Sequence, residues 1–136
     1  MVKMKIFLSY RFTGEDPKVL KETIQKICNS LDEAGHNHFC SFWKGDFFNE
    51  NKFTYKQILE HALEELDLSD VYLAFIKSED KSEGMLLEAG YAIAKGKKFI
   101  LAIKKGIYTV FLREMADQVI EFKNIEELCE KLKNLK

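Results

Sequence analysis

The chain has 136 residues, 46% of them hydrophobic, and 21 basic residues stand against 22 acidic ones for a net charge of −1. This length suffices for one domain with a sizeable core, and we expect a single domain over residues 1–136. Basic and acidic residues are interleaved, which argues against a surface for nucleic acid or for an anionic membrane.

The cysteines and the N-terminal segment bear on the compartment. Cys28, Cys40 and Cys129 are odd in number, lie far apart and have no metal-ligand spacing. Such a pattern favours reduced thiols. No apolar run reaches membrane-spanning length, and the N-terminal segment lacks the long apolar stretch of a signal peptide. We therefore expect a cytoplasmic protein with no metal or organic cofactor and no membrane contact.

The first 35 residues predict one strand, one loop and one helix. Met4 to Ser9 reads as a short buried strand, followed by a loop to Asp16. Asp16 is suited to cap a helix that starts with Pro17. Apolar residues then recur at helical spacing until Gly35 ends the segment. These apolar residues are Leu20, Ile24, Ile27 and Leu31.

The rest of the chain repeats this alternation. Further strands are expected at His38–Phe42, Asp70–Ile76, Lys98–Ile103 and, less distinctly, Val119–Phe122. Further helices are expected from about Thr54 to Leu66, from Ser82 to about Lys95, and after Asn124. Residues 43–53 are expected to form a polar and aromatic loop, and residues 104–117 give no clear pattern. The alternation predicts an α/β fold: a flavodoxin-like doubly wound sheet of about five mostly parallel strands with helices on both faces.

The stretch from Ser82 to Ala92 is the strongest candidate for a functional site. It follows an apolar strand and begins a helix, and ligands of parallel sheets sit beyond the carboxyl ends of the strands. The first turn of such a helix offers free N–H groups to anions. Ser82 and Gly84 fall in or near that turn, and Glu88 lies about a turn and a half further on, where a carboxylate can face the pocket.

A family resemblance rests on this stretch. The pattern Ser82-x-Gly84-x-x-x-Glu88-x-Gly90-x-Ala92 follows Ser69-Asp70-Val71 and precedes Lys95-Gly96-Lys97-Lys98. It resembles the nucleoside 2-deoxyribosyltransferase superfamily, most closely the branch of 2′-deoxynucleoside 5′-phosphate N-hydrolases. The resemblance implies that Glu88 is the nucleophile that attacks the anomeric carbon, and that Ser82, where transferases usually carry Asp, binds the 5′-phosphate. It also implies a homodimer in which a neighbour completes the pocket.

The residue types suit this chemistry by themselves. Cleavage of an N-glycosidic bond builds positive charge on the sugar, which a carboxylate can stabilise or capture covalently. Ser82, Gly84 and Arg11 could bind a phosphate, and an aromatic side chain such as Phe12, Trp43, Phe47 or Phe48 could stack on the base. The complete candidate set is Glu88 as catalytic residue, with Ser82, Gly84, Tyr10, Arg11, Phe12, Trp43 and Asp70 as substrate-binding residues. The expected ligand is a small nucleotide.

Some positions depart from the family pattern. Leu86 stands where the hydrolases have a second glycine, and Ala62 stands where they have a catalytic Asp. Three neighbours on the same helix, Glu60, His61 and Glu64, could substitute for that Asp. The first loop carries Tyr10 and Phe12 in place of small, glycine-rich residues, so the substrate can differ. The base, the sugar, and the choice between hydrolysis and transfer stay open.

Two alternatives remain at this point. The segment from Phe7 to Asp16 also resembles the start of a TIR domain, and enzymatic TIR domains cleave NAD at its nicotinamide bond with a glutamate six residues after a serine. Glu88 and Ser82 fit that arrangement as well. The second alternative is a non-catalytic interaction module on the same scaffold, with the aromatic loop as its binding surface. Arg11 could also simply pair with Glu15, and Asp70 could simply cap backbone groups.

Overall fold

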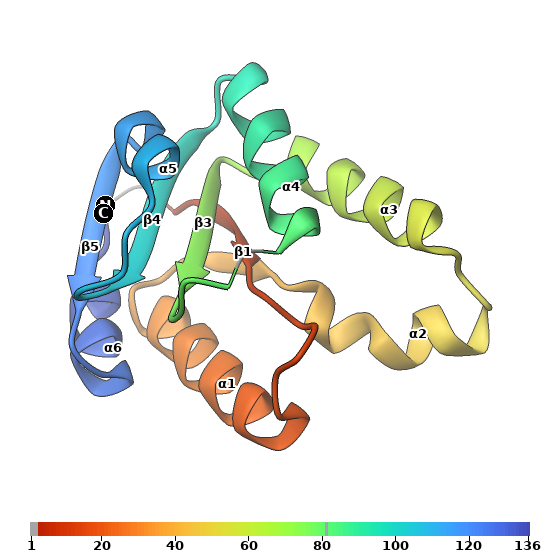
Figure 1. The fold of residues 1–136 in the computed structure, drawn as a ribbon, viewed down its shortest axis with the longest axis horizontal. Helices are drawn as coiled ribbons and strands as arrows, with labels where there is room; N and C mark the ends of the chain where they lie inside the picture. Colours follow the sequence, from red (N-terminus) through yellow and green to blue (C-terminus); the bar gives the residue numbers. More distant parts are fainter. Residues whose placement is uncertain (1–2, 81) are drawn as a thin grey trace.

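A five-stranded sheet forms the centre of the molecule (Figure 1). The computed structural model describes residues 3–80 and 82–136, so the first two residues of the N-terminal segment considered above lie outside the described residues. The strands are β1 (Lys5–Ser9), β2 (Asn37–Phe39), β3 (Val71–Ile76), β4 (Lys98–Lys104) and β5 (Gln118–Phe122). They are ordered β2-β1-β3-β4-β5, and all four neighbouring pairs are parallel. This is the flavodoxin-like order, and the fold prediction is confirmed.

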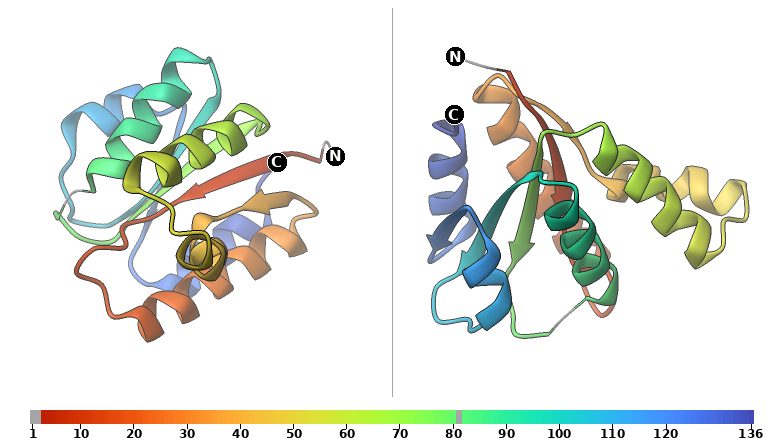
Figure 2. Two further views of the ribbon diagram at one scale, coloured as in Figure 1. Left: turned by 90° about the vertical axis from the view of Figure 1, so that its right-hand side faces the viewer. Right: turned by 90° about the horizontal axis from the view of Figure 1, so that it is seen from above.

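Helices cover both faces of the sheet (Figure 2). They are α1 (Pro17–Glu33), a 3-10 helix η1 (Ser41–Lys44), α2 (Gly45–Glu50), α3 (Tyr55–Asp67), α4 (Glu83–Ala94), α5 (Val110–Met115) and α6 (Ile125–Lys133). Helices α1 and α6 pack on one face, while α3, α4 and α5 lie on the other. Helix α2 and the first half of α3 extend beyond the sheet, and this arm borders the groove described below.

Side-chain caps fix where the longer helices begin. The Asp16 carboxylate accepts a hydrogen bond from the Lys18 N–H at 2.9 Å and Pro17 opens α1, as the sequence predicts. Thr54 and Gln57 form a reciprocal capping box at the start of α3. Asn124 accepts from the Glu127 N–H at 2.9 Å and caps α6. Each cap satisfies an N–H group that the helix leaves unpaired.

Two apolar clusters hold these layers together. The inward faces of α1 and α6 meet alternate residues of the strands, including Ile6, Leu8, Leu73 and Ile100. The residues between these point to the other face, where Phe7, Tyr72, Phe99 and Leu101 pack against Met85, Ala89 and Ala92 of α4. Because successive side chains of a strand point to opposite faces, one run of apolar residues supplies both clusters.

The structure differs from the sequence-based expectation in two segments. Strand β2 ends at Phe39, three residues before the expected end at Phe42, and η1 and α2 occupy residues 41–50, most of which are expected to form a loop. Helix α2 is held by packing: the buried Phe48 ring lies 5.3 Å from Phe53 and 5.5 Å from His61 of α3. A six-residue helix gains too little from its own hydrogen bonds to form without such contacts. The second segment is α5, which forms within the stretch that gave no pattern. None of the described helices is long and apolar enough to cross a membrane.

Candidate active site

The candidate site lies at the carboxyl ends of β1 and β3, where α4 begins. Ser82 caps this helix, because its hydroxyl oxygen accepts a hydrogen bond from the Met85 N–H at 3.2 Å. Glu88 follows Met85 by three residues and precedes Ala92 by four, and both of these are buried against the sheet. Residues three and four apart share one helix face. Glu88 therefore turns toward the strands and is only partly exposed.

The carboxylate of Glu88 is bound by one side chain of the sheet. The Ser9 hydroxyl donates to Glu88 Oε1 at 2.7 Å, and Ser9 is only 2% exposed. Burial raises the pKa of Glu88 from 4.5 to about 7, and the hydrogen bond from Ser9 opposes this rise. Removal from water penalises a charged carboxylate, whereas a donor stabilises it. Near pH 7 the side chain thus exists in both protonation states.

Neutral groups surround this carboxylate. Tyr10, Cys40 and Tyr72 lie close enough to Glu88 for their charges to interact, and burial raises the pKa of each far above its ordinary value. The Tyr72 hydroxyl donates to the Met85 carbonyl oxygen at 3.0 Å and so ties the first turn of α4 to β3. These neighbours are neutral at ordinary pH, and no Lys or Arg of the part of the chain that the structure describes forms an ion pair with Glu88.

An open groove of about 490 Å³ runs past Glu88. This volume lies in the range of small-molecule sites. The polar lining comes from Arg11, Thr13, Ser41, Ser82, Glu83, Gly84 and Glu88. The opposite wall is apolar and comes mainly from α3, with Tyr55, Ile58, Leu59, Ala62 and, from α4, Leu87. The groove therefore combines two carboxylates, one guanidinium and a helix N-terminus with an apolar wall.

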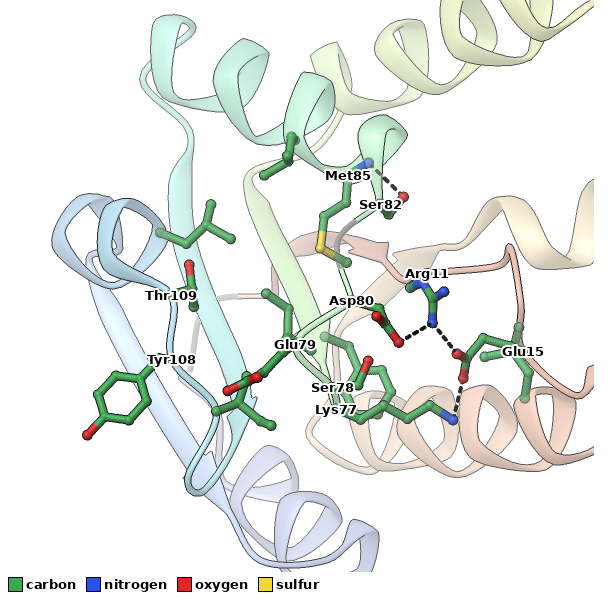
Figure 3. Close-up of a pocket in the computed structure, with 16 residues that line it drawn as sticks. Arg11, Glu15, Lys77, Ser78, Glu79, Asp80, Ser82, Met85, Tyr108 and Thr109 are labelled. Atoms are coloured by element: carbon green, nitrogen blue, oxygen red, sulfur yellow. Dashed lines mark hydrogen bonds and ion pairs between the residues drawn. The ribbon is translucent and has the colours of Figure 1, made fainter.

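Arg11 is held in an ion-pair network at the end of this groove (Figure 3). Its guanidinium lies 2.8 Å from Glu15 and 3.6 Å from Asp80, and Glu15 also pairs with Lys77. The pair with Glu15 is the alternative that the sequence left open. Gly14 has φ +82°, and a Cβ there would lie 2.9 Å from Arg11 Nη2. Only glycine fits this backbone without displacing the guanidinium.

A second cavity lies on the other side of Arg11 and Ser82 (Figure 3). Its floor is apolar, with Phe75, Met85 and Leu112, and its interior volume is about 30 Å³. That is room for only a few water molecules, far less than the groove offers. Glu88 does not line it, so the groove on the other side of Arg11 is the better candidate for a substrate.

Four of the sequence-predicted residues meet in the groove: Arg11, Ser82, Gly84 and Glu88. Tyr10 lies beside Glu88 and packs edge-to-face on Phe42 at 5.9 Å. Phe12 and Trp43, which the sequence suggests as aromatic contacts to the base, are not among the described residues that line the groove. Phe12 is largely exposed, and Trp43 lies beside Cys28 and against Phe42.

Asp70 lies away from the groove. Its carboxylate accepts a hydrogen bond from the Lys5 N–H at 2.8 Å, where β1 and β3 begin. Glu88 lies at the other ends of these strands, so Asp70 stabilises the amino edge of the sheet and does not belong to this groove. The acids considered in place of the family Asp are absent from the described lining as well. Glu60 and Glu64 are exposed on α3, and His61 packs among phenylalanine rings.

Ser9 is a residue of the site that the sequence does not single out, because it stands at the end of an apolar strand. The available signal was topological. In a parallel sheet with β1 beside β3, the last residue of β1 lies next to the loop that leads into α4. A hydroxyl in that position is therefore close to the first turns of the helix.

The fold and this groove define a flavodoxin-like α/β protein with a partly buried glutamate at the carboxyl edge of its sheet. The model of the nucleoside 2-deoxyribosyltransferase family matches residues 9–129. The chain therefore belongs to this family, and the resemblance to TIR domains is the weaker of the two. Among curated protein sequences, none matches this chain. Within the described residues there is no group of three or more His, Cys, Asp or Glu side chains that could hold a metal ion.

Solved structures share the whole architecture. The CMP N-glycosidase BcmB of Clostridium botulinum superposes with a TM-score of 0.71 at 21% identity, over 94% of this chain and 96% of that one. A 2-deoxyribosyltransferase of Bacillus psychrosaccharolyticus superposes with a TM-score of 0.70 at 19% identity, and the match covers 97% of this chain and 92% of that one. A conserved protein of Enterococcus faecalis V583 superposes with a TM-score of 0.67 at 17% identity, and the match covers 97% of this chain and 98% of that one. At these identities the likeness concerns the fold.

Proposed function

We propose that the protein is a nucleotide N-glycosidase that cleaves the bond between base and sugar in a nucleoside 5′-monophosphate, with Glu88 as nucleophile. The observation that carries this proposal is the carboxylate itself, which is buried at the carboxyl edge of the sheet, held by Ser9 and open to a groove. Family membership supports glycosidic chemistry, and the CMP N-glycosidase with the same fold supports a monophosphate substrate.

The reaction takes two steps. One oxygen of Glu88 bonds to C1′ of the sugar while the bond from C1′ to the base nitrogen breaks, and the base leaves with the electron pair and takes up a proton. Water then attacks C1′, which regenerates the carboxylate and gives the free sugar phosphate. If a second base attacks in place of water, the same intermediate gives transfer. Because Ala62 supplies no acid, the departing base takes its proton from water in the open groove.

The phosphate binds at the start of α4. The Ser82 hydroxyl accepts from the Met85 N–H and keeps its own hydrogen to donate to a phosphate oxygen. The N–H groups of the first turn, near Gly84, and the Arg11 guanidinium add donors and positive potential. Asp80 is 74% exposed on its side chain and lies at 3.6 Å from Arg11, so a phosphate can replace it at low cost.

We also propose that the active form is a homodimer. Tyr55 at the start of α3 is 92% exposed, and Leu87 on α4 is exposed beside it along the same groove. A second copy would cover these apolar side chains and narrow the groove. Light scattering coupled to size-exclusion chromatography tests this, since a mass near 16 kDa at micromolar concentration would contradict it.

The test of the proposed function is the release of free base, detected by chromatography. The substrates are ribo- and deoxyribonucleoside 5′-monophosphates, the corresponding nucleosides, and NAD. We expect release from monophosphates, with a rate that rises as pH increases through about 7, because only the ionised Glu88 attacks. In the Glu88→Gln variant the rate of base release should fall at least about 1,000-fold, since the substitution removes the nucleophile.

The matched control is Glu22→Gln, the same substitution at an exposed position of α1 far from the groove. It should retain wild-type activity. Release of nicotinamide alone would assign the protein to NAD cleavage, and the absence of any released base, with or without an added acceptor base, would contradict the enzymatic proposal.

A further inference from the structure

The hydrogen bond between Ser9 and Glu88 joins two side chains that are 79 residues apart in the sequence. Ser9 is the last residue of β1 and pairs in register with Ala74 of β3. Ala74 has no side chain beyond Cβ, which leaves space above the strand for the glutamate. A serine hydroxyl has one hydrogen to donate, and here Glu88 Oε1 receives it at 2.7 Å.

We infer that Ser9 is the positioning residue of Glu88: its hydroxyl holds one carboxylate oxygen against the sheet and leaves the other oxygen directed at the groove. The inference rests on the proposed function in so far as it assigns the attack to Glu88. A nucleophile must be held close to its attack geometry for the reaction to be fast, and a hydrogen bond to one of its two oxygens fixes its rotamer.

A second buried hydrogen bond anchors α4 to the sheet without involving the carboxylate. The Tyr72 hydroxyl donates to the Met85 carbonyl oxygen, so β3 holds α4 through its backbone, one turn before Glu88. Ser9 holds the same helix through the carboxylate of Glu88. If Ser9 served only to anchor α4, the loss of its hydroxyl would lower the stability of the protein and leave the ionisation of Glu88 unchanged. If Ser9 positions the nucleophile, the loss of its hydroxyl also changes the ionisation of Glu88.

The ionisable groups that face Glu88 come from several elements. Tyr10 of the first loop, Cys40 after β2 and Tyr72 of β3 are all kept neutral by burial. Arg11, Glu83 and Tyr55 line the same groove. None of them forms a hydrogen bond or ion pair to Glu88 among the contacts of the described residues, so Ser9 is the direct donor to the carboxylate.

The direction of the effect follows from this arrangement. A donated hydrogen bond stabilises the charged carboxylate more than the neutral acid, so Ser9 lowers the pKa of Glu88 against the effect of burial. Removal of the hydroxyl raises that pKa. The pH at which activity rises should then move upward, and the loss of rate should be largest near pH 7 and smaller at pH 9.

The experiment compares three variants. Ser9→Ala removes the donor, and Ser9→Cys keeps the shape with a weaker donor. The matched control is Ser30→Ala, because Ser30 is also a buried serine, 3% exposed, and its hydroxyl donates to the Lys26 carbonyl oxygen within α1. In pH–rate profiles we expect the acid limb to move up by about 1 unit in Ser9→Ala, by less in Ser9→Cys, and not at all in Ser30→Ala. An unmoved limb in both Ser9 variants, or an equal shift in Ser30→Ala, would overturn the inference.

A measurement without substrate keeps this result distinct from the proposed function. The side-chain carboxyl of Glu88 can be followed by NMR in protein labelled with ¹³C at glutamate carboxyls, and assigned by its absence in Glu88→Gln. Its titration midpoint should rise from about 7 in the wild type to a higher pH in the Ser9 variants. An unchanged midpoint refutes the role of Ser9 even if base is released. Should Ser9→Ala fail to fold, Ser9→Cys decides in the same way.

Discussion

Two nearly buried carboxylates lie on either side of Arg11, and they are satisfied in opposite ways. Glu15, with its side chain 9% exposed, is bound by two cations, Arg11 at 2.8 Å and Lys77. Glu88 is bound by the Ser9 hydroxyl and has neutral tyrosines as further neighbours. One carboxylate belongs to a structural ion pair, whereas the other has no cation paired with it among the described residues.

The difference shows which carboxylate is available for chemistry. A buried charge normally persists only when it is paired, and cations meet this requirement at Glu15. At Glu88 the cost of burial instead appears as a pKa raised to about 7. An enzyme nucleophile that must bond to carbon cannot be occupied by a guanidinium. A groove that contains such a carboxylate is therefore a functional candidate for physical reasons, and not only by resemblance.

The largest predicted effect concerns stability around Glu88. Its pKa is raised in the folded state, so the folded protein holds a proton that the unfolded chain releases from about pH 4.5 upward. The pH dependence is therefore opposite in sign to that of an acid in a salt bridge. As pH rises from about 4.5 to 7, the ionisation of Glu88 lowers the free energy of unfolding. The free energy of unfolding of Glu88→Gln, relative to that of the wild type, should therefore increase by about 2 to 3 kcal/mol between pH 5 and pH 8.

Urea denaturation at pH 5, 6, 7 and 8 measures this difference. The control is Glu22→Gln, the same substitution at an exposed position of α1, whose stability should stay within about 0.5 kcal/mol of wild type. A difference between Glu88→Gln and wild type that does not grow with pH would show that the carboxylate is not destabilised by burial, and the contrast with Glu15 would disappear.

The second prediction concerns Glu15 and has the opposite sign. Glu15→Gln leaves Arg11 and Lys77 without their shared partner, and it should lower the free energy of unfolding by about 1 to 2 kcal/mol at pH 8. The two cations are partly exposed, which keeps the loss below that of a fully buried pair. The loss should shrink between 50 mM and 1 M salt because of screening. A stabilised Glu15→Gln protein would contradict this account.

The sequence predicted the parts of the structure that depend on periodic burial and on caps. The parallel sheet follows from apolar runs that alternate with amphipathic helices, and α1 begins where Asp16 and Pro17 require. The presence of Glu88, Ser82 and Arg11 in one groove follows from the rule that loops at the carboxyl edge converge. These features are local, or they follow directly from strand order.

The features that were missed depend on contacts between distant segments. Helix α2 forms because Phe48 packs against Phe53 and His61. Six residues are too few to show a helical hydrophobic period from which this packing could be predicted. The bond from Ser9 to Glu88 spans 79 residues and requires knowledge of strand order and of helix rotation. Asp70 was assigned to the site from its place in a motif, yet it lies at the other edge of the sheet.

The smallest predicted effect isolates Arg11, the residue between the two carboxylates. Gly14→Ala places an L-residue at φ +82° and puts its Cβ against the Arg11 guanidinium. Gly96 has a similar backbone conformation, φ +70°, but a Cβ there would have no atom within 4 Å, so Gly96→Ala is the matched control. Both should lose about 1 kcal/mol of stability from the left-handed conformation. Only Gly14→Ala should displace Arg11 and disturb its pairs with Glu15 and Asp80.

Steady-state kinetics with a monophosphate and its nucleoside then separate the roles. In Gly14→Ala we expect a KM for the monophosphate raised severalfold, an unchanged KM for the nucleoside, and an acid limb of the pH profile still near 7, because Ser9 and Glu88 are untouched. Gly96→Ala should change none of these. An unchanged KM for the monophosphate would mean that Arg11 serves only the ion pair with Glu15. A shifted acid limb would mean that the two carboxylates are coupled through Arg11, so that Glu88 is not electrostatically separate from the cations that neutralise Glu15.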